Sequence, residues 1–356
     1  MSNAPAAQPA AAGAADRHTP VLLNRCLELL APALAVPDPV MIDCTLGMGG
    51  HAEGALERFP ELTLIGIDRD PQAIALASAR LARFGDRFRA VRATYDAVDA
   101  VARDASRRSD HTVDAILMDL GVSSLQLDDA DRGFSYAHPA PLDMRMDQTA
   151  GRTAQDLLDT ADECELAYIL RTYGEERFAS RIAAAIVRRR STGSPITTTA
   201  ELAELVRENI PAAARRRGGN PAKRTFQALR IAVNGELDLL ERALPRALNS
   251  LRVGGRIVVE SYQSLEDRIV KQALAAGASA AAPADLPFIP EGLEPYLELV
   301  GHGAQKADAA EVAANPRSAS VRLRAATRIR PAHQAPAPTI HSASAPAEKT
   351  RGRNRR

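Results

Sequence analysis

Short apolar runs alternate with helical stretches between Val40 and Asp119. This alternation limits the possible folds more than any other feature of the chain. The apolar runs predict four strands, at residues 40–43, 62–68, 88–92 and 113–119. The stretches between them predict helices at 50–58, 71–84 and 95–103. Strands joined by helices pair in parallel, so the sequence predicts an α/β fold built on a mostly parallel sheet.

The alternation of apolar runs and helical stretches ends after Asp119. Helical periodicity with almost no strand-like run predicts helices at 153–160, 164–173, 175–190 and 199–209. An amphipathic pattern at 224–251, interrupted at Pro245, is followed by an apolar run at 256–260, a helix at 265–274 and a last strand at 320–328 on the sheet edge. We therefore predict one α/β domain, formed by residues 18–130 and 224–330, with a helical domain inserted at 131–223.

The composition is that of a soluble globular protein. Hydrophobic residues make up 46% and charged residues 25% of the 356 positions, and no apolar run approaches the roughly 20 residues of a membrane helix. Cys26, Cys44 and Cys164 lie far apart without CxxC spacing, which argues against a disulfide framework and against a zinc site. We expect a cytoplasmic protein without a metal, with a disordered leader at 1–17 and a disordered basic tail at 331–356.

The first predicted strand ends in a glycine-rich loop, and the second ends in an acidic residue. Gly47, Gly49 and Gly50 allow the backbone to turn sharply into the first helix and to approach a ligand closely. Asp68 ends the second strand, where a carboxylate can accept hydrogen bonds from two ribose hydroxyls. Together they predict a nucleoside-binding edge of the sheet.

Three interpretations of this loop compete. The spacing Gly47-x-Gly49-x-x-Ala52 also fits the fingerprint of NAD-dependent oxidoreductases, and a tight turn from strand to helix can bind nothing at all. Asp43, which opens the loop, suits the amino-acid end of S-adenosylmethionine, and His51 stands where a pyrophosphate would prefer bare helix N–H groups. The loop therefore favours S-adenosylmethionine as the cofactor.

The fourth strand ends at Asp119, which is followed by small residues up to Ser124. Ligands bind at this edge of an open α/β sheet, where the strand order switches. An exocyclic cytosine amine is a weak nucleophile, so a catalyst must align it and accept a hydrogen bond as positive charge develops. Asp119, or the backbone carbonyls of residues 120–122, can do so; the alternative is that Asp119 caps the next turn.

Further blocks of sequence carry a specific resemblance. They are HTPVLL at 18–23, MDLGVSS at 118–124, QLD at 126–128, RGFS at 132–135, PLDMRMD at 141–147, YGEER at 173–177, TFQALRI at 225–231, SLEDR at 264–268 and NPR at 315–317. Over residues 18–328 the chain resembles the RsmH (MraW) family of bacterial small-subunit rRNA cytosine-N4 methyltransferases. NAD-dependent enzymes are not expected to carry these blocks.

The resemblance implies a class I S-adenosylmethionine-dependent methyltransferase fold, which is Rossmann-like, with an inserted helical domain for substrate recognition. It implies methyl transfer to N4 of a cytidine in the decoding region of 16S rRNA, in an assembled or nearly assembled 30S subunit, by a monomer or homodimer that needs no membrane. The cofactor contacts that it implies fall on Gly50, His51, Ala52, Asp68, Tyr95, Asp119 and Gln126.

The chain departs from the family pattern at three positions. Ala52 stands where the family commonly has Ser, and Tyr262-Gln263 stands where the family usually has Phe-His. Gln263 can form hydrogen bonds but cannot titrate near neutral pH. A non-catalytic RNA-binding remnant is therefore an alternative to an active enzyme.

Arginine runs in the inserted segment predict contacts with RNA phosphates. The candidates are Arg145, Arg215, Arg216, Arg217, Lys223 and Arg224, and a further run lies at 188–190. A solvated helix end is the alternative interpretation of such runs. Tyr136, Tyr173 and Phe178 are candidate stacking partners for an unstacked base, although packing in the core is the more common role of such residues.

Overall fold

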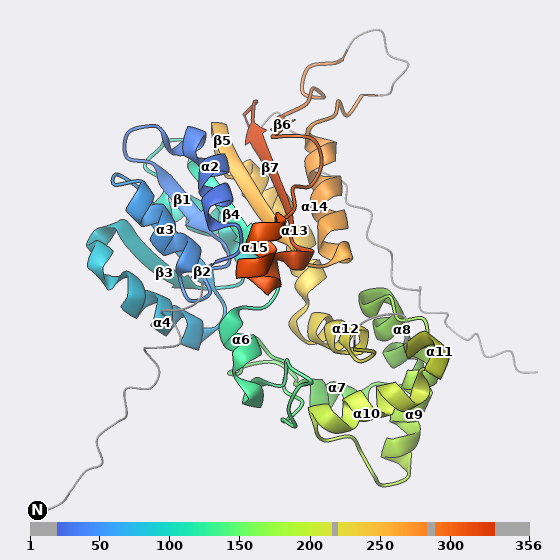
Figure 1. Ribbon diagram of the computed structural model, residues 1–356. Coiled ribbons are helices and arrows are strands. Elements are labelled where there is room, and N and C mark those ends of the chain that lie inside the picture. Colours follow the sequence, from blue (N-terminus) through green and yellow to red (C-terminus); the bar gives the residue numbers. More distant parts are fainter. Residues whose placement is uncertain (1–19, 216–219, 283–288, 332–356) are drawn as a thin grey trace, which may run out of the picture.

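Seven strands form one sheet in the computed structural model, which describes residues 20–215, 220–282 and 289–331 (Figure 1). They are β1 (Val40–Asp43), β2 (Thr63–Asp68), β3 (Phe88–Arg92), β4 (Val113–Asp119), β5 (Leu251–Ser261), β6 (Leu297–Leu299) and β7 (Arg322–Arg328). Their order across the sheet is β3-β2-β1-β4-β5-β7-β6. The first five strands pair in parallel, and β7 is antiparallel to β5 and β6. The predicted α/β fold with a mostly parallel sheet is confirmed.

Both faces of the sheet are covered by helices. Because alternate residues of a strand point to opposite faces, Val40 and Ile42 of β1 pack in one core and Met41 packs in another. The first core includes residues of α5 (Val98–Ala105), α13 (Glu236–Asn249) and α14 (Ser264–Gly277). The second includes residues of α2 (Leu23–Leu34), α3 (Gly50–Arg58) and α4 (Pro71–Leu81). Burial on both faces explains why the central strands β1, β2 and β4 are mostly apolar.

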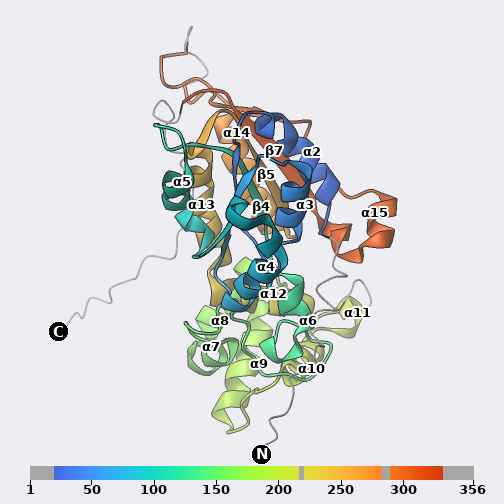
Figure 2. The same cartoon turned by 90° about the vertical axis from the view of Figure 1, so that its left-hand side faces the viewer.

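A group of helices forms a separate lobe, which lies beyond one end of the sheet in both views (Figures 1 and 2). They are α7 (Ala154–Thr160), α8 (Glu163–Gly174), α9 (Ala179–Ser191), α10 (Thr199–Asn209), α11 (Ala212–Arg215) and α12 (Lys223–Asn234). The lobe has its own apolar core, to which α12 contributes Phe226 and Leu229. Since α13 follows α12 directly, this helix pair connects the lobe to the sheet.

Short elements complete the described chain. They are α6 (Ser124–Asp128), α15 (Ala309–Ala314) and the 3₁₀ helices η1 (Ala82–Arg87), η2 (Tyr95–Ala97), η3 (Ala130–Arg132) and η4 (Pro316–Ser320). The leader predicted at 1–17 lies outside the described residues, as does the tail predicted at 331–356 apart from its first residue. Among the residues that the structure describes, no helix has the length and apolar character needed to cross a membrane.

Several predicted helices have different bounds in the structure, and two of these differences have a clear cause in the backbone. The sequence predicts a break at Pro245, but the chain breaks at Gly235, whose φ of 60° ends α12 and starts α13. Pro245 lies inside α13. The helix predicted at 175–190 begins only at Ala179, because Glu175 adopts a left-handed conformation, with φ of 48°, at the end of α8.

The prediction that the last strand lies on the sheet edge is wrong. β7 pairs with β5 on one side, and the three residues of β6 pair with its other side. The sequence also failed to predict α2. Its N-cap, Leu22, has a φ of 45° and forms no side-chain capping bond, so the usual start signal of a helix is absent from this segment.

Candidate active site

A cavity of about 390 Å³ lies at the carboxyl ends of β1, β2 and β4. β1 stands between β2 and β4, so the strand order reverses here, at the point where open α/β sheets bind ligands. Three side chains of α12 complete the wall: Lys223, Gln227 and Arg230. The cavity therefore lies between the sheet and the helical lobe, and its volume is within the usual range for a small-molecule site.

Hydrogen bonds join the glycine-rich loop to Asp68. The Gly47 N–H donates to Oδ2 of Asp68 at 2.8 Å, and the Asp70 N–H donates to Oδ1 at 2.9 Å. Gly49, with φ of 80°, is the N-cap of α3, and a side chain there would also crowd Leu81. The loop thus brings its backbone and the Asp68 carboxylate to the same wall of the cavity.

Most of the predicted cofactor-binding residues line this cavity. They are Gly47, Gly50, His51, Asp68, Tyr95, Asp119 and Gln126. Asp43, Gly49 and Ala52 do not line it, and Asp43 and Ala52 are buried in the fold. A direct contact between these three residues and a ligand stays a prediction, whereas their contribution to the shape of the loop is visible.

Asp43 contacts the loop from within the protein. Its Oδ1 accepts a hydrogen bond from the Thr45 N–H at 3.0 Å, and Thr45 Oγ1 in turn accepts one from the Asp119 N–H at 2.6 Å. Asp43 therefore fixes Thr45, and Thr45 in turn fixes the backbone of Asp119. Burial raises the pKa of Asp43 to about 6, although His51 and the Thr45 amide oppose the shift.

We expect the free energy of unfolding of Asp43→Asn, measured relative to that of wild type, to increase as the pH rises from 4 to 7. The folded state keeps the Asp43 proton up to about pH 6, whereas the unfolded state loses it near the ordinary pKa of 3.8. This difference lowers the wild-type free energy of unfolding by up to about 3 kcal/mol across that range, and Asn removes the loss.

Urea unfolding of both proteins at pH 4, 5, 6 and 7 measures this effect. Asp156→Asn is the matched control, because hydrogen bonds from Thr153 lower the pKa of this exposed carboxyl and its effect has the opposite sign. A constant difference between Asp43→Asn and wild type at all four pH values would show that Asp43 does not titrate in this range.

Asp119 is held by two side chains at the cavity wall. The Tyr262 hydroxyl donates to Oδ1 of Asp119 at 2.8 Å, and Nδ1 of His51 lies 3.7 Å from Oδ2. About 30% of the Asp119 side chain is exposed, so the carboxylate can meet a ligand while its orientation is fixed. Tyr262 thus keeps the aromatic ring of the Phe in the family pattern and adds a hydroxyl that contacts Asp119.

Tyr95 and Gln126 line the cavity and also support its wall. The Tyr95 hydroxyl donates to the Glu236 carbonyl at 3.0 Å, and burial raises its pKa, so it remains a neutral apolar surface with a fixed ring. Gln126 belongs to the capping box that starts α6 with Ser123, and its side-chain amide donates to Asp70 at 3.3 Å.

Sequence reasoning missed several cavity residues. Gln227 and Arg230 lie in the TFQALRI block and Arg317 lies in the NPR block, but neither block indicated a role. Arg230 forms a two-pronged ion pair with Glu236, with both N–O distances at 2.8 Å. Arg317 contacts Ser124 and pairs with Asp128 at 2.7 Å, so η4 is tied to α6 at the cavity.

The predicted RNA-binding residues are dispersed in the structure. Lys223 is exposed at the cavity, and Arg224 is exposed and donates to the Glu175 carbonyl at 2.9 Å. Arg145 forms an ion pair with Asp143 at 2.8 Å and does not line the cavity. Arg215 ends α11, whereas Arg216 and Arg217 lie outside the described residues.

Gln263 and the candidate stacking aromatics also have structural partners. Gln263 is the N-cap of α14 and lines the cavity, and its backbone N–H and side-chain amide both donate to Glu266, at 3.2 and 2.9 Å. Tyr136, Tyr173 and Phe178 pack against the core of the helical lobe, and Tyr136 meets Phe226 edge to face. The core role of these aromatics is the one that the structure supports.

The residues of the cavity suit S-adenosylmethionine. Asp68 offers a carboxylate for the ribose, while Leu120, Val122 and Met146 add apolar surface for a base. The amino end of the nine-residue helix α3 adjoins the loop and favours a carboxylate such as that of the methionine part. The ribose, the base and the carboxylate of the cofactor thus each have a matching group in the cavity.

The chain matches the model of the MraW methylase family over residues 15–329. The chain belongs to this family. It is 63% identical to a protein of Beutenbergia cavernae named ribosomal RNA small subunit methyltransferase H, over 92% of this chain and 97% of that protein. A protein of the same name from Nocardia farcinica is 57% identical over 88% of this chain and 96% of its own length. Membership of the family, together with the strand order, confirms the class I fold and S-adenosylmethionine as the cofactor.

We expect Asp68→Ala to weaken the binding of S-adenosylmethionine by about 1 to 3 kcal/mol, or roughly 5- to 150-fold, because two hydrogen bonds to the ribose are lost. Calorimetric titration measures this change. Asp68→Asn keeps one acceptor oxygen and should give a smaller loss, and Asp86→Ala, at an exposed site outside the cavity, should give none. Unchanged affinity in Asp68→Ala would remove this residue from the site.

Proposed function

We propose that this protein transfers a methyl group from S-adenosylmethionine to N4 of a cytidine in the decoding region of 16S rRNA. The names of its relatives support methylation of small-subunit rRNA. The observation that carries the finer proposal is the fixed carboxylate of Asp119 at the cavity wall, since an exocyclic amine needs an oriented acceptor rather than a strong base.

Asp119 is the proposed catalytic residue. When bound, S-adenosylmethionine supplies an electrophilic methyl group. Asp119 accepts a hydrogen bond from the cytidine amine and stabilises the positive charge that develops on its nitrogen. Tyr262 keeps the carboxylate in one orientation through the hydrogen bond to Oδ1. The amine loses its proton after the methyl group has been transferred, so Asp119 need only hold this proton or pass it to water.

Methylation at C5 of cytosine is a competing reaction, which requires a thiolate to attack C6 of the ring. Cys44 lines the cavity, but burial, with a smaller effect of Asp43, raises the pKa of its thiol well above the ordinary value. The thiol therefore stays protonated at neutral pH and is a poor nucleophile. This favours the exocyclic amine as the methyl acceptor.

The helical lobe is the proposed substrate-recognition domain. The sequence predicts that this domain covers residues 131–223, but α12 (Lys223–Asn234) also packs in the core of the lobe, so its proposed extent is 131–234. Lys223 and Arg224 stand exposed where α12 meets the cavity, and Arg215 and Arg188 lie farther along the same lobe. Cationic side chains placed beside the cavity and along the lobe can hold RNA phosphates while one nucleotide enters the cavity. The proposed partner is the small subunit in an assembled or nearly assembled state.

The test is transfer of a tritiated methyl group to purified ribosomal particles from cells that lack the endogenous activity. We expect label in small subunits and at least tenfold less in free 16S rRNA or large subunits. The label should remain in the fragment of 16S rRNA that is protected from nuclease by a DNA strand complementary to the decoding region. Label in large subunits, or in another region of 16S rRNA, would contradict the proposal.

A further inference from the structure

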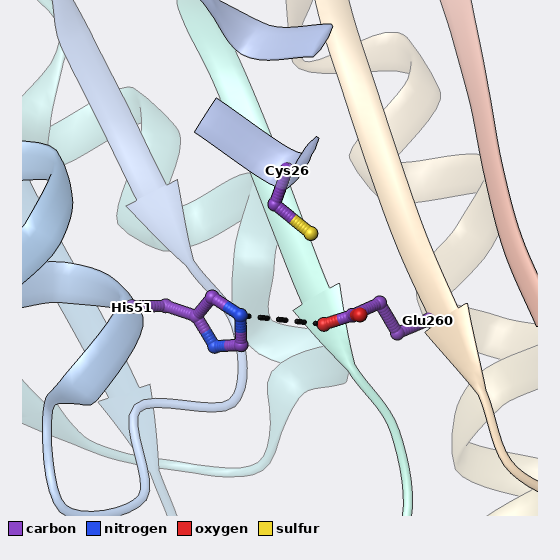
Figure 3. Close-up of side chains that lie close together, drawn as sticks. All are labelled: Cys26, His51 and Glu260. Carbon is purple, nitrogen blue, oxygen red and sulfur yellow. Dashed lines mark ion pairs between the residues drawn. The ribbon is translucent and has the colours of Figure 1, made fainter. Parts of the chain in front are cut away.

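Three metal-binding side chains from distant parts of the sequence meet behind the cavity. Cys26 comes from α2, His51 from α3 and Glu260 from β5, and all three are buried (Figure 3). One donor atom of each lies within 4.8 Å of the other two, and Nε2 of His51 is 3.4 Å from Oε2 of Glu260. Cys26 and Glu260 do not line the cavity, whereas His51 does, so this cluster adjoins the cofactor pocket.

The Glu260 carboxylate has an unusual environment. Its side chain is fully buried, and its partners among the described residues are the other two members of the cluster: Nε2 of His51 lies 3.4 Å from Oε2, and the Cys26 thiol donates a hydrogen bond to the carboxylate. Burial, and then the negative charge of Asp119, raise the pKa of Glu260, and burial and Glu260 itself raise the pKa of the Cys26 thiol. Buried carboxylates of this kind are usually paired or coordinate a metal, because an unpaired buried charge is costly.

We propose that Cys26, His51 and Glu260 bind one divalent transition-metal ion, with Zn²⁺ the best match. A thiolate and a carboxylate carry two negative charges, which a divalent ion balances while imidazole stays neutral. Sulfur, nitrogen and oxygen donors together suit zinc and its neighbours rather than Mg²⁺ or Ca²⁺. Binding releases the protons of the thiol and the carboxyl group to solvent.

The distances agree with tetrahedral coordination. Bonds of about 2.0 to 2.2 Å from zinc to nitrogen and oxygen place these two donor atoms about 3.3 to 3.5 Å apart, and the observed separation is 3.4 Å. The Val21 carbonyl oxygen lies 3.0 Å from Nε2 and is near enough to act as a fourth donor. Cys26 Sγ lies within 4.8 Å of the other two donor atoms, whereas tetrahedral coordination needs about 3.6 Å, so this side chain has to approach them by up to about 1 Å to complete the set.

The surroundings of His51 also suit a metal ligand. Ligating histidines commonly donate their second ring N–H to a carboxylate, which fixes the ring and its tautomer. Here Nδ1 faces Oδ2 of Asp119 at 3.7 Å, while Nε2 faces the cluster. The ion would therefore join the amino-terminal helix α2 to β5 and hold the ring of His51 at the cavity wall. CxxC spacing cannot predict such a site, because its ligands come from three separate segments.

Titration of Co²⁺ into the metal-stripped full-length protein tests the proposal without measuring activity. Co²⁺ bound to a thiolate gives a charge-transfer band in the near ultraviolet, and tetrahedral Co²⁺ gives strong visible bands. We expect both bands to saturate at one ion per chain and to disappear when Zn²⁺ is added. Cys44→Ser is the matched control, because Cys44 is also buried but lies outside the cluster.

Cys26→Ser should abolish the charge-transfer band, and Glu260→Gln should weaken binding of Co²⁺ at least tenfold, while Cys44→Ser binds like wild type. Zn²⁺ should raise the Tm of wild type and Cys44→Ser but not that of Cys26→Ser. Circular dichroism checks that each variant is folded. If Cys26→Ser does not fold, Glu260→Gln tests the site independently. Absence of the band in wild type, or equal binding by Cys26→Ser, would overturn the proposal and leave Nε2–H of His51 as a donor to the Val21 carbonyl.

Discussion

Asp119→Asn is expected to lower kcat for methyl transfer by about two to four orders of magnitude, which is the usual effect of removing a positioned acid–base group. The amide is neutral and cannot stabilise the positive charge on the cytidine amine. Single-turnover kinetics with small subunits and saturating S-adenosylmethionine measures the chemical step alone. The affinity for the cofactor, measured by calorimetry, should change much less than kcat.

Tyr262→Phe is the matched control for Asp119→Asn. It removes only the hydrogen bond to Oδ1 of Asp119 and keeps the ring, so we expect a loss of about 1 kcal/mol, or roughly fivefold in rate. If Asp119→Asn retained a rate within threefold of wild type, the backbone carbonyls of residues 120–122 would become the better candidates for the acceptor.

Arg132→Ala should destabilise the protein by about 3 to 5 kcal/mol, the usual cost of breaking a buried ion pair from one side. Arg132 Nη1 lies 2.5 Å from Oδ2 of Asp70, and both side chains are about 2% exposed. Arg132 Nη2 also donates to the Met146 carbonyl at 2.7 Å. Loss of Arg132 therefore leaves a buried carboxylate at the start of α4 and frees the segment that leads into the helical lobe.

Urea unfolding at pH 7 measures this loss of stability. Two further variants separate the effect of the buried ion pair from that of an exposed one and from that of the remaining charge. Arg207→Ala removes an exposed ion pair with Glu204 and should change stability by less than about 1 kcal/mol. The double variant Arg132→Met with Asp70→Asn removes both charges and should be more stable than Arg132→Ala. A loss below about 1 kcal/mol for Arg132→Ala would show that Asp70 is well solvated after the substitution.

The sequence predicted β1 to β5 and β7 but missed the three-residue edge strand β6. The central strands could be predicted because they are apolar, short and separated by clear helix signals. Pro71 after Asp70 marks the start of α4, and the glycine-rich loop marks the end of β1. The same signals were absent before α2, where Leu22 provides no capping side chain. Gly235 and Pro245 both interrupt a helical pattern, and the chain breaks at Gly235, which adopts a left-handed conformation, while Pro245 lies inside α13.

The site was predicted in part, for a physical reason. Loop residues such as Gly47 and Asp68 show their role through their position after a strand. Arg230 and Arg317 reach the cavity from segments far away in sequence, and no local pattern reveals this. Glu260 lies in a run of residues that reads as an ordinary buried strand, and its carboxylate is noticed only when Cys26 and His51 are placed beside it.

The most direct test of the proposed reaction is identification of the methylated nucleoside. Small subunits methylated by the purified protein are digested to nucleosides, which are separated and analysed by mass spectrometry against synthetic standards. The account predicts that the new methyl group is found on N4 of cytidine and that Asp119→Asn gives little of this product. A methyl group on C5 of cytidine, or on another base, would contradict it.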